Sequence, residues 1–417
     1  MPAALFERFG VEIEHMIVAR DSPELAVLPI ADRLLAAAAG EPTGEFENGP
    51  ITWSNELALH VVELKVTEPA SSLAPLPEKF HASALRMIAL LEPLGARLLP
   101  TGMHPFMVPE RDMRLWPHDC APVYAAFDRI FSCRGHGWAN LQSVHLNLPF
   151  SGDDEFARLH AAIRLLLPIL PALAASTPFK EGRATGLLDT RLETYRTNAR
   201  AVPSVTGRVV PEPVRSRDEY EEKILGPIYA DMAPLDPEGI LRHEWVNARG
   251  AIARFERDTI EIRVLDSQEC PSADVAVVAA VVAVLRRLVA GEWAAPESIA
   301  RFPGEPLETL FLETIREADR AVVRDGGYLS ALGRRERGPV TAGELWRDLA
   351  DRTLAKEEDG RAFLPHLRRI TTEGPLARRI LRRAGRGATR ESIAAVYRDL
   401  ARCLEENRPL EAAPGGP

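Results

Sequence analysis

The chain has 417 residues, of which 46% are hydrophobic and 27% are charged, as in ordinary folded globular proteins. This length allows one large catalytic domain or two ordinary domains, and it excludes a short peptide module. The 60 acidic and 51 basic residues give a formal net charge of −9. A nucleic-acid binder usually carries a clustered positive excess, so we expect no nucleic-acid partner and favour small-molecule partners instead.

The cysteines and the apolar segments indicate a cytoplasmic protein. The four cysteines lie far apart and form no CxxC motif, so neither a zinc cluster nor a disulfide framework is expected. The N-terminus lacks the basic start and apolar run of a secretory signal. The longest uninterrupted apolar stretch, residues 275–285, is shorter than the ~20 residues that span a bilayer. We therefore expect a buried helix there and no membrane partner.

Helical and strand-like segments alternate along the first 300 residues, and no linker rich in Gly, Ser or Pro divides them. We therefore expect one catalytic domain over residues 1–300. A helical, Arg-rich region with solvated charged faces should follow over residues 301–410 and pack on the same body, and a frayed tail should follow at 411–417. Helices are predicted, in chain order, at residues 27–39, 75–94, 156–174, 217–228, 273–290, 307–325, 342–354, 361–370, 376–384 and 389–406.

Five segments alternate apolar and polar residues as strands do, namely residues 9–17, 60–66, 142–148, 249–256 and 259–265. In the first, Glu12 and Glu14 alternate with Val11 and Ile13, so a strand would place both carboxylates on one face. The last two segments are predicted to form a hairpin. The polar positions of the five segments are Glu12, Glu14, Glu63, Lys65, Ser143, His145, Asn147, Arg254, Glu261 and Arg263.

These polar positions favour a metal-binding face. Solvated strand faces usually carry Thr, Ser, Lys and Gln, whereas carboxylates and imidazole are ligands of divalent metals. Several acidic groups on one face would also repel one another unless cations neutralised them. An ordinary half-exposed sheet remains the alternative. The expected metal ligands are Glu12, Glu14, Glu63, His145 and Glu261.

Arginines near this face indicate a phosphate-containing substrate. Guanidinium groups such as those of Arg254 and Arg263 bind phosphates, and Mg²⁺ binds through a few carboxylates together with substrate phosphates. The chain contains neither a GxxxxGK[ST] motif nor a dinucleotide fingerprint, so metals and arginines would have to hold the phosphates. Arg191 and Arg196 are further candidate anion contacts. They follow a turn-rich loop around Thr185, which either lines a substrate cleft or only turns the chain.

The sequence resembles the glutamate-cysteine ligase superfamily, including its bacterial carboxylate-amine ligase branch. The resemblance implies an α+β fold like the catalytic domain of glutamine synthetase, in which a curved, mainly antiparallel sheet forms a funnel and helices cover its outer face. The matching pieces follow the family's order and are Gly10-Val11-Glu12-Ile13-Glu14, Glu63-Leu64-Lys65, Gly102-Met103-His104-Pro105, Gln142-Ser143-Val144-His145-Leu146-Asn147, Ser176-Thr177-Pro178-Phe179 with Gly182 and Thr185-Gly186, and Thr259-Ile260-Glu261-Ile262-Arg263-Val264-Leu265-Asp266.

By this resemblance, the five predicted ligands would hold two or three Mg²⁺ ions, with Mn²⁺ as a substitute, that bridge ATP to the substrate. Arg263 would contact the transferring phosphate, and we assign a catalytic role to Arg254 as well. The expected substrate or nucleotide contacts are Lys65, Gln142, Asn147, Thr185, Arg191 and Arg196.

The predicted function is an ATP-dependent ligase that joins a carboxylate, expected to be the γ-carboxylate of glutamate, to an amine such as cysteine through an acyl phosphate. Two alternatives stay open. A metal-dependent amidohydrolase would use a metal-activated water and usually more histidines, and a non-catalytic relative would only bind a ligand. The sequence leaves open which amine reacts and whether the acid is free glutamate or a glutamyl group of a larger molecule. A homodimer is compatible with it.

Overall fold

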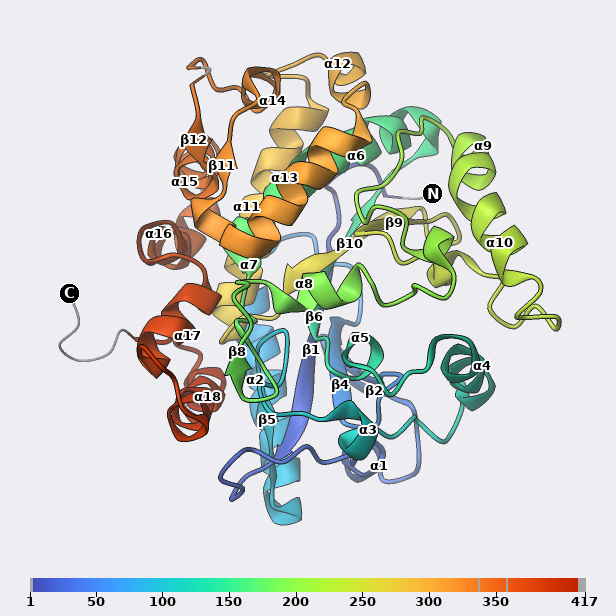
Figure 1. Ribbon diagram of the computed structural model, residues 1–417, viewed down its shortest axis with the longest axis vertical. Coiled ribbons are helices and arrows are strands. Elements are labelled where there is room, and N and C mark those ends of the chain that lie inside the picture. The colour runs from blue at the N-terminus through green and yellow to red at the C-terminus, as the bar shows by residue number, and fades with distance from the viewer. Residues whose placement is uncertain (1–2, 337, 358, 412–417) are drawn as a thin grey trace.

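The computed structural model describes residues 3–336, 338–357 and 359–411 (Figure 1). Within them, eight strands form one sheet in the order β2-β3-β4-β1-β6-β10-β9, and β5 pairs with the second half of β1. Neighbouring strands of this sheet pair antiparallel. The strands are β1 (Gly10–Ala19), β2 (Glu45–Asn48), β3 (Ile51–Asn55), β4 (Val61–Val66), β5 (Ala96–Leu99), β6 (Ser143–Pro149), β9 (Ala251–Arg254) and β10 (Thr259–Asp266).

All five predicted strands are confirmed, as β1, β4, β6, β9 and β10. The predicted hairpin is confirmed too, because Thr259 at the start of β10 pairs with Arg254 at the end of β9. Strands β2, β3 and β5 extend the sheet beyond the prediction. Two short hairpins lie outside it, β7 (Phe179–Lys180) with β8 (Arg183–Ala184) and β11 (Val322–Val323) with β12 (Val340–Thr341).

A β-bulge interrupts the pairing of β10 with β6 after Ile262. Two residues of β10, Arg263 and Val264, lie there opposite the single residue His145 of β6. A bulge of this kind re-aims the side chains that follow it. The alternation of faces shifts by one residue, and Leu265 joins the buried core instead of following Arg263 to the polar face.

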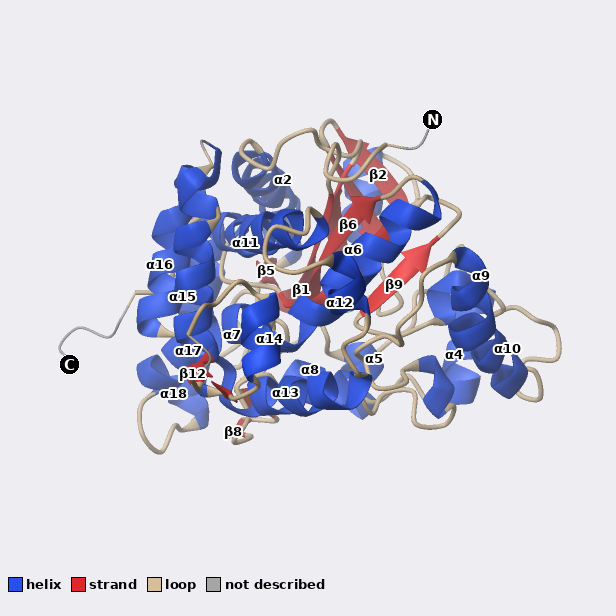
Figure 2. Cartoon of the chain, turned by 90° about the horizontal axis from the view of Figure 1, so that it is seen from above, coloured by secondary structure: helices blue, strands red, loops and turns tan. Residues whose placement is uncertain are grey.

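Helices surround the sheet, and Figure 2 shows it between α2, α11 and α15–α18 on one side and α4, α9 and α10 on the other. The helices are α1 (Ala31–Ala39), α2 (Leu76–Leu91), α3 (Pro109–Asp112), α4 (Ala121–Phe131), α5 (His136–Ala139), α6 (Gly152–Leu166), α7 (Pro171–Ala174), α8 (Thr190–Tyr195), α9 (Arg217–Tyr220), α10 (Gly226–Met232), α11 (Pro271–Val289), α12 (Pro296–Ala300), α13 (Gly304–Glu317), α14 (Gly326–Ala331), α15 (Ala342–Arg352), α16 (Leu364–Glu373), α17 (Leu376–Ala384) and α18 (Arg390–Glu406).

Most predicted helices are present, but several predicted ranges differ in extent. The helix predicted over residues 27–39 begins only at Ala31, and the one predicted over residues 217–228 continues to Met232 as α9, a π-helical turn and α10. The helix predicted over residues 156–174 divides into α6, a 3₁₀ turn and α7, because Pro168 and Pro171 have no N–H to continue the helical hydrogen bonds. The helix predicted over residues 307–325 ends at Glu317, since Ala318 adopts a φ of 44° outside the helical region. Helices α4, α5 and α8, which flank the site described below, are not among the predicted ones.

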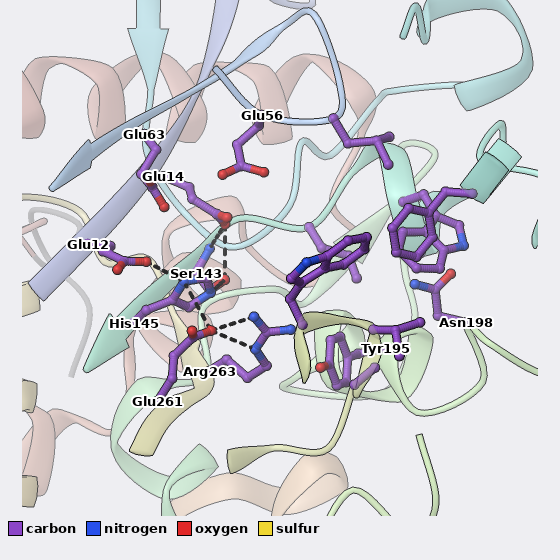
Figure 3. A pocket seen from close by; sticks show the side chains of 18 of the residues that line it. Glu12, Glu14, Glu56, Glu63, Ser143, His145, Tyr195, Asn198, Glu261 and Arg263 are labelled. Atoms are coloured by element: carbon purple, nitrogen blue, oxygen red, sulfur yellow. Dashed lines mark hydrogen bonds and ion pairs between the residues drawn. The ribbon is translucent and has the colours of Figure 1, made fainter. Parts of the chain in front are cut away.

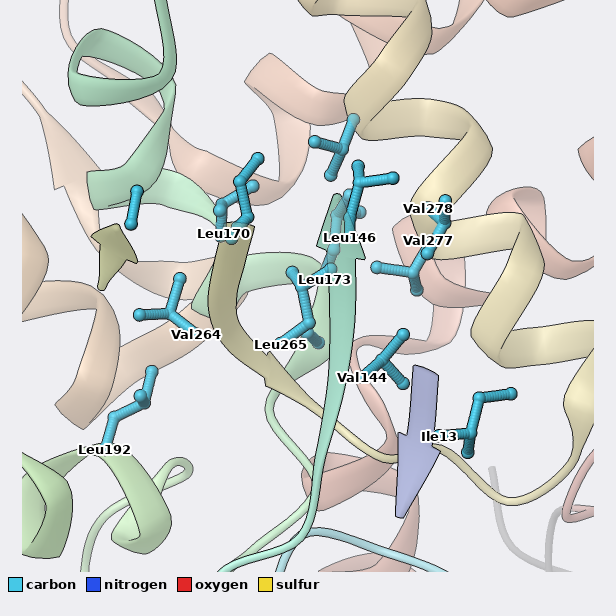
Figure 4. Packing of buried hydrophobic residues seen from close by; sticks show 14 of the residues in the cluster. Ile13, Val144, Leu146, Leu170, Leu173, Leu192, Val264, Leu265, Val277 and Val278 are labelled. Carbon is cyan, nitrogen blue, oxygen red and sulfur yellow. The ribbon is translucent and has the colours of Figure 1, made fainter. Parts of the chain in front are cut away.

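The apolar face of the sheet packs on α11. Nearly every residue of this helix is buried, which explains why its sequence is apolar on all sides. Figure 4 shows Val277 and Val278 of α11 beside Ile13 of β1 and Val144 and Leu146 of β6. The polar face of the same strands is thereby fixed on the opposite side of the sheet.

The helical C-terminal region is confirmed and packs on the same body. Helix α18 contacts β5 and α2, α16 contacts α11, and one hydrophobic cluster includes buried residues from β1 to α18. The expectation of solvated charged faces is wrong for Arg379, which is buried and pairs with the buried Glu269. The boundary at residue 300 stays a prediction. Of the tail predicted to fray, residues 412–417 lie outside the described residues.

In the described part of the chain, no helix combines the length and apolar character needed to cross a membrane. The overall architecture is α+β, with a mainly antiparallel sheet, helices on both sides of it and a helical C-terminal region. This agrees with the predicted fold class.

Candidate active site

A cavity of about 410 Å³ lies over the polar face of the sheet (Figure 3). One part of its lining is charged and comes mainly from the strands. The other part is largely aromatic and comes mainly from α4, α5, α8 and the segment before β9. The charged lining residues are Glu12, Glu14, Glu56, Glu63, Lys65, His145, Arg191, Arg254, Arg257, Glu261 and Arg263, and the aromatic ones are Tyr124, Phe127, Trp138, Tyr195 and Trp245.

The strand register brings the predicted metal ligands together. Glu12 of β1 lies directly opposite Lys65 of β4 on one side and His145 of β6 on the other. Glu14 lies opposite Glu63. Side chains that are directly opposite in an antiparallel pair point to the same face, so these residues converge on the cavity although up to 133 positions separate them in the chain.

Hydrogen bonds hold these carboxylates in place. His145 Nδ1 lies 3.0 Å from Glu12 Oε2. The backbone N–H and the hydroxyl of Ser143 donate to Glu14 Oε2 at 2.6 and 3.0 Å, and the Ser54 hydroxyl donates to Glu63 Oε2 at 2.7 Å. Glu12, Glu14 and Glu63 therefore each have a fixed orientation before any ligand binds.

Two groups of side chains have the geometry of cation sites. Glu12, Glu63 and His145 form one group, and Glu14, Glu56 and Glu63 form the other. Within each group the potential ligand atoms all lie within 4.8 Å of one another. Carboxylate oxygens with one imidazole suit Mg²⁺ or Mn²⁺. These residues fit two divalent cations that share Glu63.

The electrostatics of these groups also favour cations. Burial and the nearby charge of Glu12 raise the pKa of Glu63 to about 8. Burial and the charges of Glu63 and Glu14 raise the pKa of Glu56 well above its ordinary value. Burial opposes a charged imidazole, yet the carboxylates around His145 outweigh it and raise its pKa to about 9. Without metal, protons take the place of the positive charges that this face requires.

Glu261 lies beside the two groups but belongs to neither. Arg263 Nε donates to Glu261 Oε1 at 3.0 Å, and Arg254 Nη1 donates to Oε2 at 3.2 Å. Burial opposes its ionisation, but these arginines and His145 lower the pKa of Glu261 to about 2. His145 Nδ1 lies 3.9 Å from Glu261 Oε1. The role of Glu261 as a metal ligand stays a prediction, and it requires that an arginine release the Glu261 carboxylate.

Arg191 reaches the cavity from α8 and is almost fully buried, at 2% exposure. Its Nη1 lies 3.3 Å from Asp266 Oδ1, and its Nη2 donates to the backbone carbonyl of Arg263 at 2.8 Å. The Asp266 carboxylate also accepts hydrogen bonds from Ser176 and Thr177. Arg191 is therefore locked to the strand that carries Arg263.

Four predicted contacts do not line this cavity. The Asn147 amide donates to Glu12 Oε1 at 2.9 Å and so supports a predicted ligand. Gln142 is buried, and its side-chain amide has no hydrogen-bond partner among the described residues. Thr185 bonds with Thr190 within its own loop, and Arg196 pairs with Glu193 of α8 at 2.6 Å. Their predicted substrate roles have no support from these positions.

Glu56 was missed by the sequence analysis although it completes the second group of ligand atoms. It directly follows β3, where Thr52 and Ser54 occupy the same alternating positions. Extension of the alternation in this segment through residue 56 would have placed Glu56 on the polar face. The aromatic lining was also missed, because its residues come from loops and short helices far apart in the chain.

We expect the metal-free protein to lose thermal stability as the pH rises from about 7 to about 9. Glu63 and His145 bind a proton more tightly in the folded chain, with pKa values near 8 and 9, than their ordinary values of 4.5 and 6.5 allow. Between its ordinary and its folded pKa, each group keeps a proton in the folded state that the unfolded state has released, so stability falls by up to ~1.4 kcal/mol per pH unit for each group until the pH passes the folded pKa. Melting temperatures in EDTA across this range measure the loss.

Mg²⁺ should reverse this loss, and its stabilising effect should grow with pH because the cation replaces the bound protons. The buried His60 does not contribute to this pH dependence, because burial lowers its pKa to about 4 and its imidazole stays neutral from pH 7 to pH 9. A melting temperature that is independent of pH in EDTA would contradict the assignment of these groups.

The comparisons with known proteins show the family and agree with the fold. The sequence profile of glutamate-cysteine ligase family 2 matches residues 8–399. An uncharacterized protein of Archaeoglobus fulgidus is 34% identical over 380 residues, which cover 91% of this chain and 94% of that protein. A Pseudomonas aeruginosa protein with the name "Putative glutamate--cysteine ligase 2" is 28% identical over 428 residues, which cover 98% of this chain and 92% of the relative.

Solved structures show the same fold at low sequence identity. Glutamate–cysteine ligase of Francisella tularensis, crystallised in complex with AMP, aligns with a TM-score of 0.60 and 13% identity and covers 95% of this chain and 88% of its own. A bifunctional glutathione synthetase of Pasteurella multocida aligns with a TM-score of 0.55 and 14% identity, over 95% of this chain and 53% of its own. The family profile covers nearly the whole chain, and this protein therefore belongs to glutamate-cysteine ligase family 2.

Proposed function

We propose that this protein is an ATP-dependent ligase that forms an amide bond between a carboxylate, expected to be the γ-carboxylate of glutamate, and an amine. The observation that carries the proposal is the pair of ligand groups that share Glu63, placed in the same cavity as Arg254 and Arg263. Family membership and the AMP complex of the Francisella enzyme support a nucleotide as co-substrate.

The metals that fit this site, Mg²⁺ or Mn²⁺, would neutralise charge on the β- and γ-phosphates of ATP and align the transfer. The residues of the chain provide the rest. Arg263 and Arg254 donate hydrogen bonds to the migrating phosphoryl group, in place of those they now make to Glu261. Lys65 adds a positive charge at the edge of the acidic face, 3.9 Å from Glu63.

The proposed reaction proceeds through an acyl phosphate and needs no protein nucleophile. The γ-phosphoryl group passes to the substrate carboxylate, and ADP leaves. The amine then attacks the acyl carbon, and phosphate leaves as the amide forms. The aromatic part of the cavity excludes water from this intermediate, which would otherwise hydrolyse.

We expect an ¹⁸O label in the substrate carboxylate to appear in the released phosphate, because that oxygen becomes the bridge to phosphorus and leaves with it. The assay combines Mg²⁺-ATP with labelled glutamate and a panel of amines that includes cysteine, and mass spectrometry locates the label. ADP release that requires both acid and amine is the matching kinetic result.

Other outcomes would overturn this proposal. Label in AMP would indicate adenylation of the carboxylate, and label in neither product would show ATP hydrolysis that is uncoupled from amide formation. Turnover of an amide without any use of ATP would indicate a metal-dependent amidohydrolase. A complete lack of turnover with tight ligand binding would indicate a non-catalytic relative.

The cellular location and the assembly are further proposals. All four cysteines are free, and Cys133, Cys270 and Cys403 are buried while Cys120 is exposed. Free thiols persist in a reducing compartment, which supports the cytoplasm. A homodimer stays a prediction that light scattering can test.

A further inference from the structure

A second cavity of about 670 Å³ adjoins the active-site cavity. The two share Gly137, Trp138 and Asn198 as lining residues. Figure 3 shows Asn198 on the side of the active-site cavity that lies away from the carboxylates. The second cavity therefore lies next to the aromatic part of the active site.

The partition between the two cavities is thin. Trp138 packs against Phe127, which lines the active-site cavity, and against Phe131, which lines the second one, at centroid distances of 5.0 and 5.4 Å. The three rings form one cluster, since the centroids of Phe127 and Phe131 are 5.9 Å apart. Gly137 packs so closely on Asn198 that a Cβ at this position would lie 2.2 Å from Asn198 Oδ1. Only the backbone of residue 137 therefore fits at this point of the partition. Trp138 and Asn198 line both cavities, so a molecule bound against these two side chains lies at the boundary of both.

The second cavity offers positive charge that the protein itself does not use. Arg134 and Arg200 line it, both are exposed, and neither forms an ion pair with another described residue. Arg196 and Arg208, close in sequence to Arg200, pair with Glu193 and Glu308 instead.

The polar groups at the partition are unoccupied as well. Trp138 Nε1 is buried without a hydrogen-bond partner, and the Asn198 side chain bonds with no other described residue. Glu110 is the one carboxylate among the described residues that line the second cavity. Two guanidinium groups and an indole N–H, none with an acceptor among the described residues, suit an anionic ligand with hydrogen-bond acceptors along its length.

We propose that this second cavity binds the anionic extension of the acid substrate. The reacting glutamyl side chain would lie at the acidic face, the peptide bond would pass Trp138 and Asn198, and the terminal carboxylates would bind Arg134 and Arg200. The preferred acid is then a short acidic peptide that begins with glutamate, and free glutamate is the poorer ligand. This inference rests on the proposed function. A protonated amine is disfavoured here because both arginines would repel it.

Calorimetric binding to the full-length protein tests the inference without turnover. The ligands are L-glutamate, L-glutamyl-L-alanine and L-glutamyl-L-aspartate, each with Mg²⁺ and a non-hydrolysable ATP analogue. We expect the acidic dipeptide to bind about 10-fold more tightly than glutamate, as one charge-assisted hydrogen bond allows. The double variant Arg134→Ala/Arg200→Ala should lose this gain and keep its affinity for glutamate.

Arg301→Ala is the matched control, because Arg301 is exposed, lines neither cavity and forms no ion pair with a described residue. It should retain the full preference. Equal affinities for the three ligands, no binding of either dipeptide at millimolar concentration, or an equal loss in Arg301→Ala would overturn the inference. Binding of inorganic phosphate at the two arginines, without tighter binding of the acidic dipeptide than of glutamate, would also overturn the inference.

ADP release with the same acids separates this inference from the proposed function. Retention of the binding preference without ADP release for any acid and amine would refute the ligase reaction and leave the acidic-peptide site in place. ADP release that is equal for glutamate and the dipeptides, with equal binding, would refute the acidic-peptide site and leave the ligase.

Discussion

The variant Glu63→Gln is expected to release ADP at least about 100-fold more slowly than the unmodified protein. Glu63 belongs to both groups of ligand atoms, so its loss weakens two cation sites at once. Loss of a residue that only supports a metal ligand typically costs 10- to 100-fold in affinity or activity, and a shared ligand should cost at least as much. Steady-state ADP release at several Mg²⁺ concentrations measures the effect.

The same variant should be more stable than the unmodified protein when metal is absent. Burial and the nearby charge of Glu12 disfavour the ionised Glu63 side chain and raise its pKa to about 8. At neutral pH the folded protein must therefore keep this carboxyl protonated although the unfolded chain ionises it, and a neutral amide removes that cost. The hydrogen bond from Ser54 can persist, since the amide oxygen also accepts. Glu41→Gln, at an exposed position between α1 and β2, is the control and should change neither property. Unchanged ADP release in Glu63→Gln would refute the shared metal site.

The variant Arg263→Lys should lower kcat by about 10- to 100-fold although it keeps the positive charge. The planar guanidinium of Arg263 now binds Glu261 through two nitrogens, and it can bind a phosphoryl group in the same way. An ammonium group is a single point of charge, so the second hydrogen bond in the transition state is lost. Measurement of kcat and KM for ATP separates this effect from a loss of ground-state binding.

Arg368→Lys provides the comparison, because Arg368 is an exposed residue of α16 that forms no ion pair with another described residue. Its replacement should change kcat less than about 2-fold, as expected for a surface substitution. Equal reductions at the two positions would show that Arg263 has no special role in phosphoryl transfer.

Alternation of apolar and polar residues was sufficient to predict the acidic face. It placed Glu12 and Glu14 of β1 on one face with Glu63 of β4, and the antiparallel register then brought them together. Alternation could not predict the β-bulge at Arg263, since a bulge depends on how two strands pair and not on the order of residues in one of them. Alternation also could not predict that the side-chain amide of Asn147 donates a hydrogen bond to Glu12.

Features that depend on distant segments could not be read from the sequence. The aromatic lining requires α4, α5 and the segment before β9 to meet, and each of them alone resembles an ordinary loop or short helix. Arg379 looked like one more residue of a charged, solvated helix, but the buried Glu269 that pairs with it lies 110 positions earlier. Burial of this kind is set by tertiary packing rather than by local composition.

The packing of helix α18 against β5 and α2 has a consequence for how the protein folds. Glu405 pairs with Arg97 of β5 at 2.7 Å, and its backbone carbonyl lies 2.9 Å from His81 Nε2 of α2, at sequence separations of 308 and 324. Contacts of such long sequence separation carry a large loop-closure entropy and slow the folding of a chain. During synthesis, β5 and α2 leave the ribosome long before α18, so their apolar surfaces stay uncovered until the last helix is made. A shortened chain that lacks α18 would therefore be prone to aggregate even though it retains every residue that lines the active-site cavity.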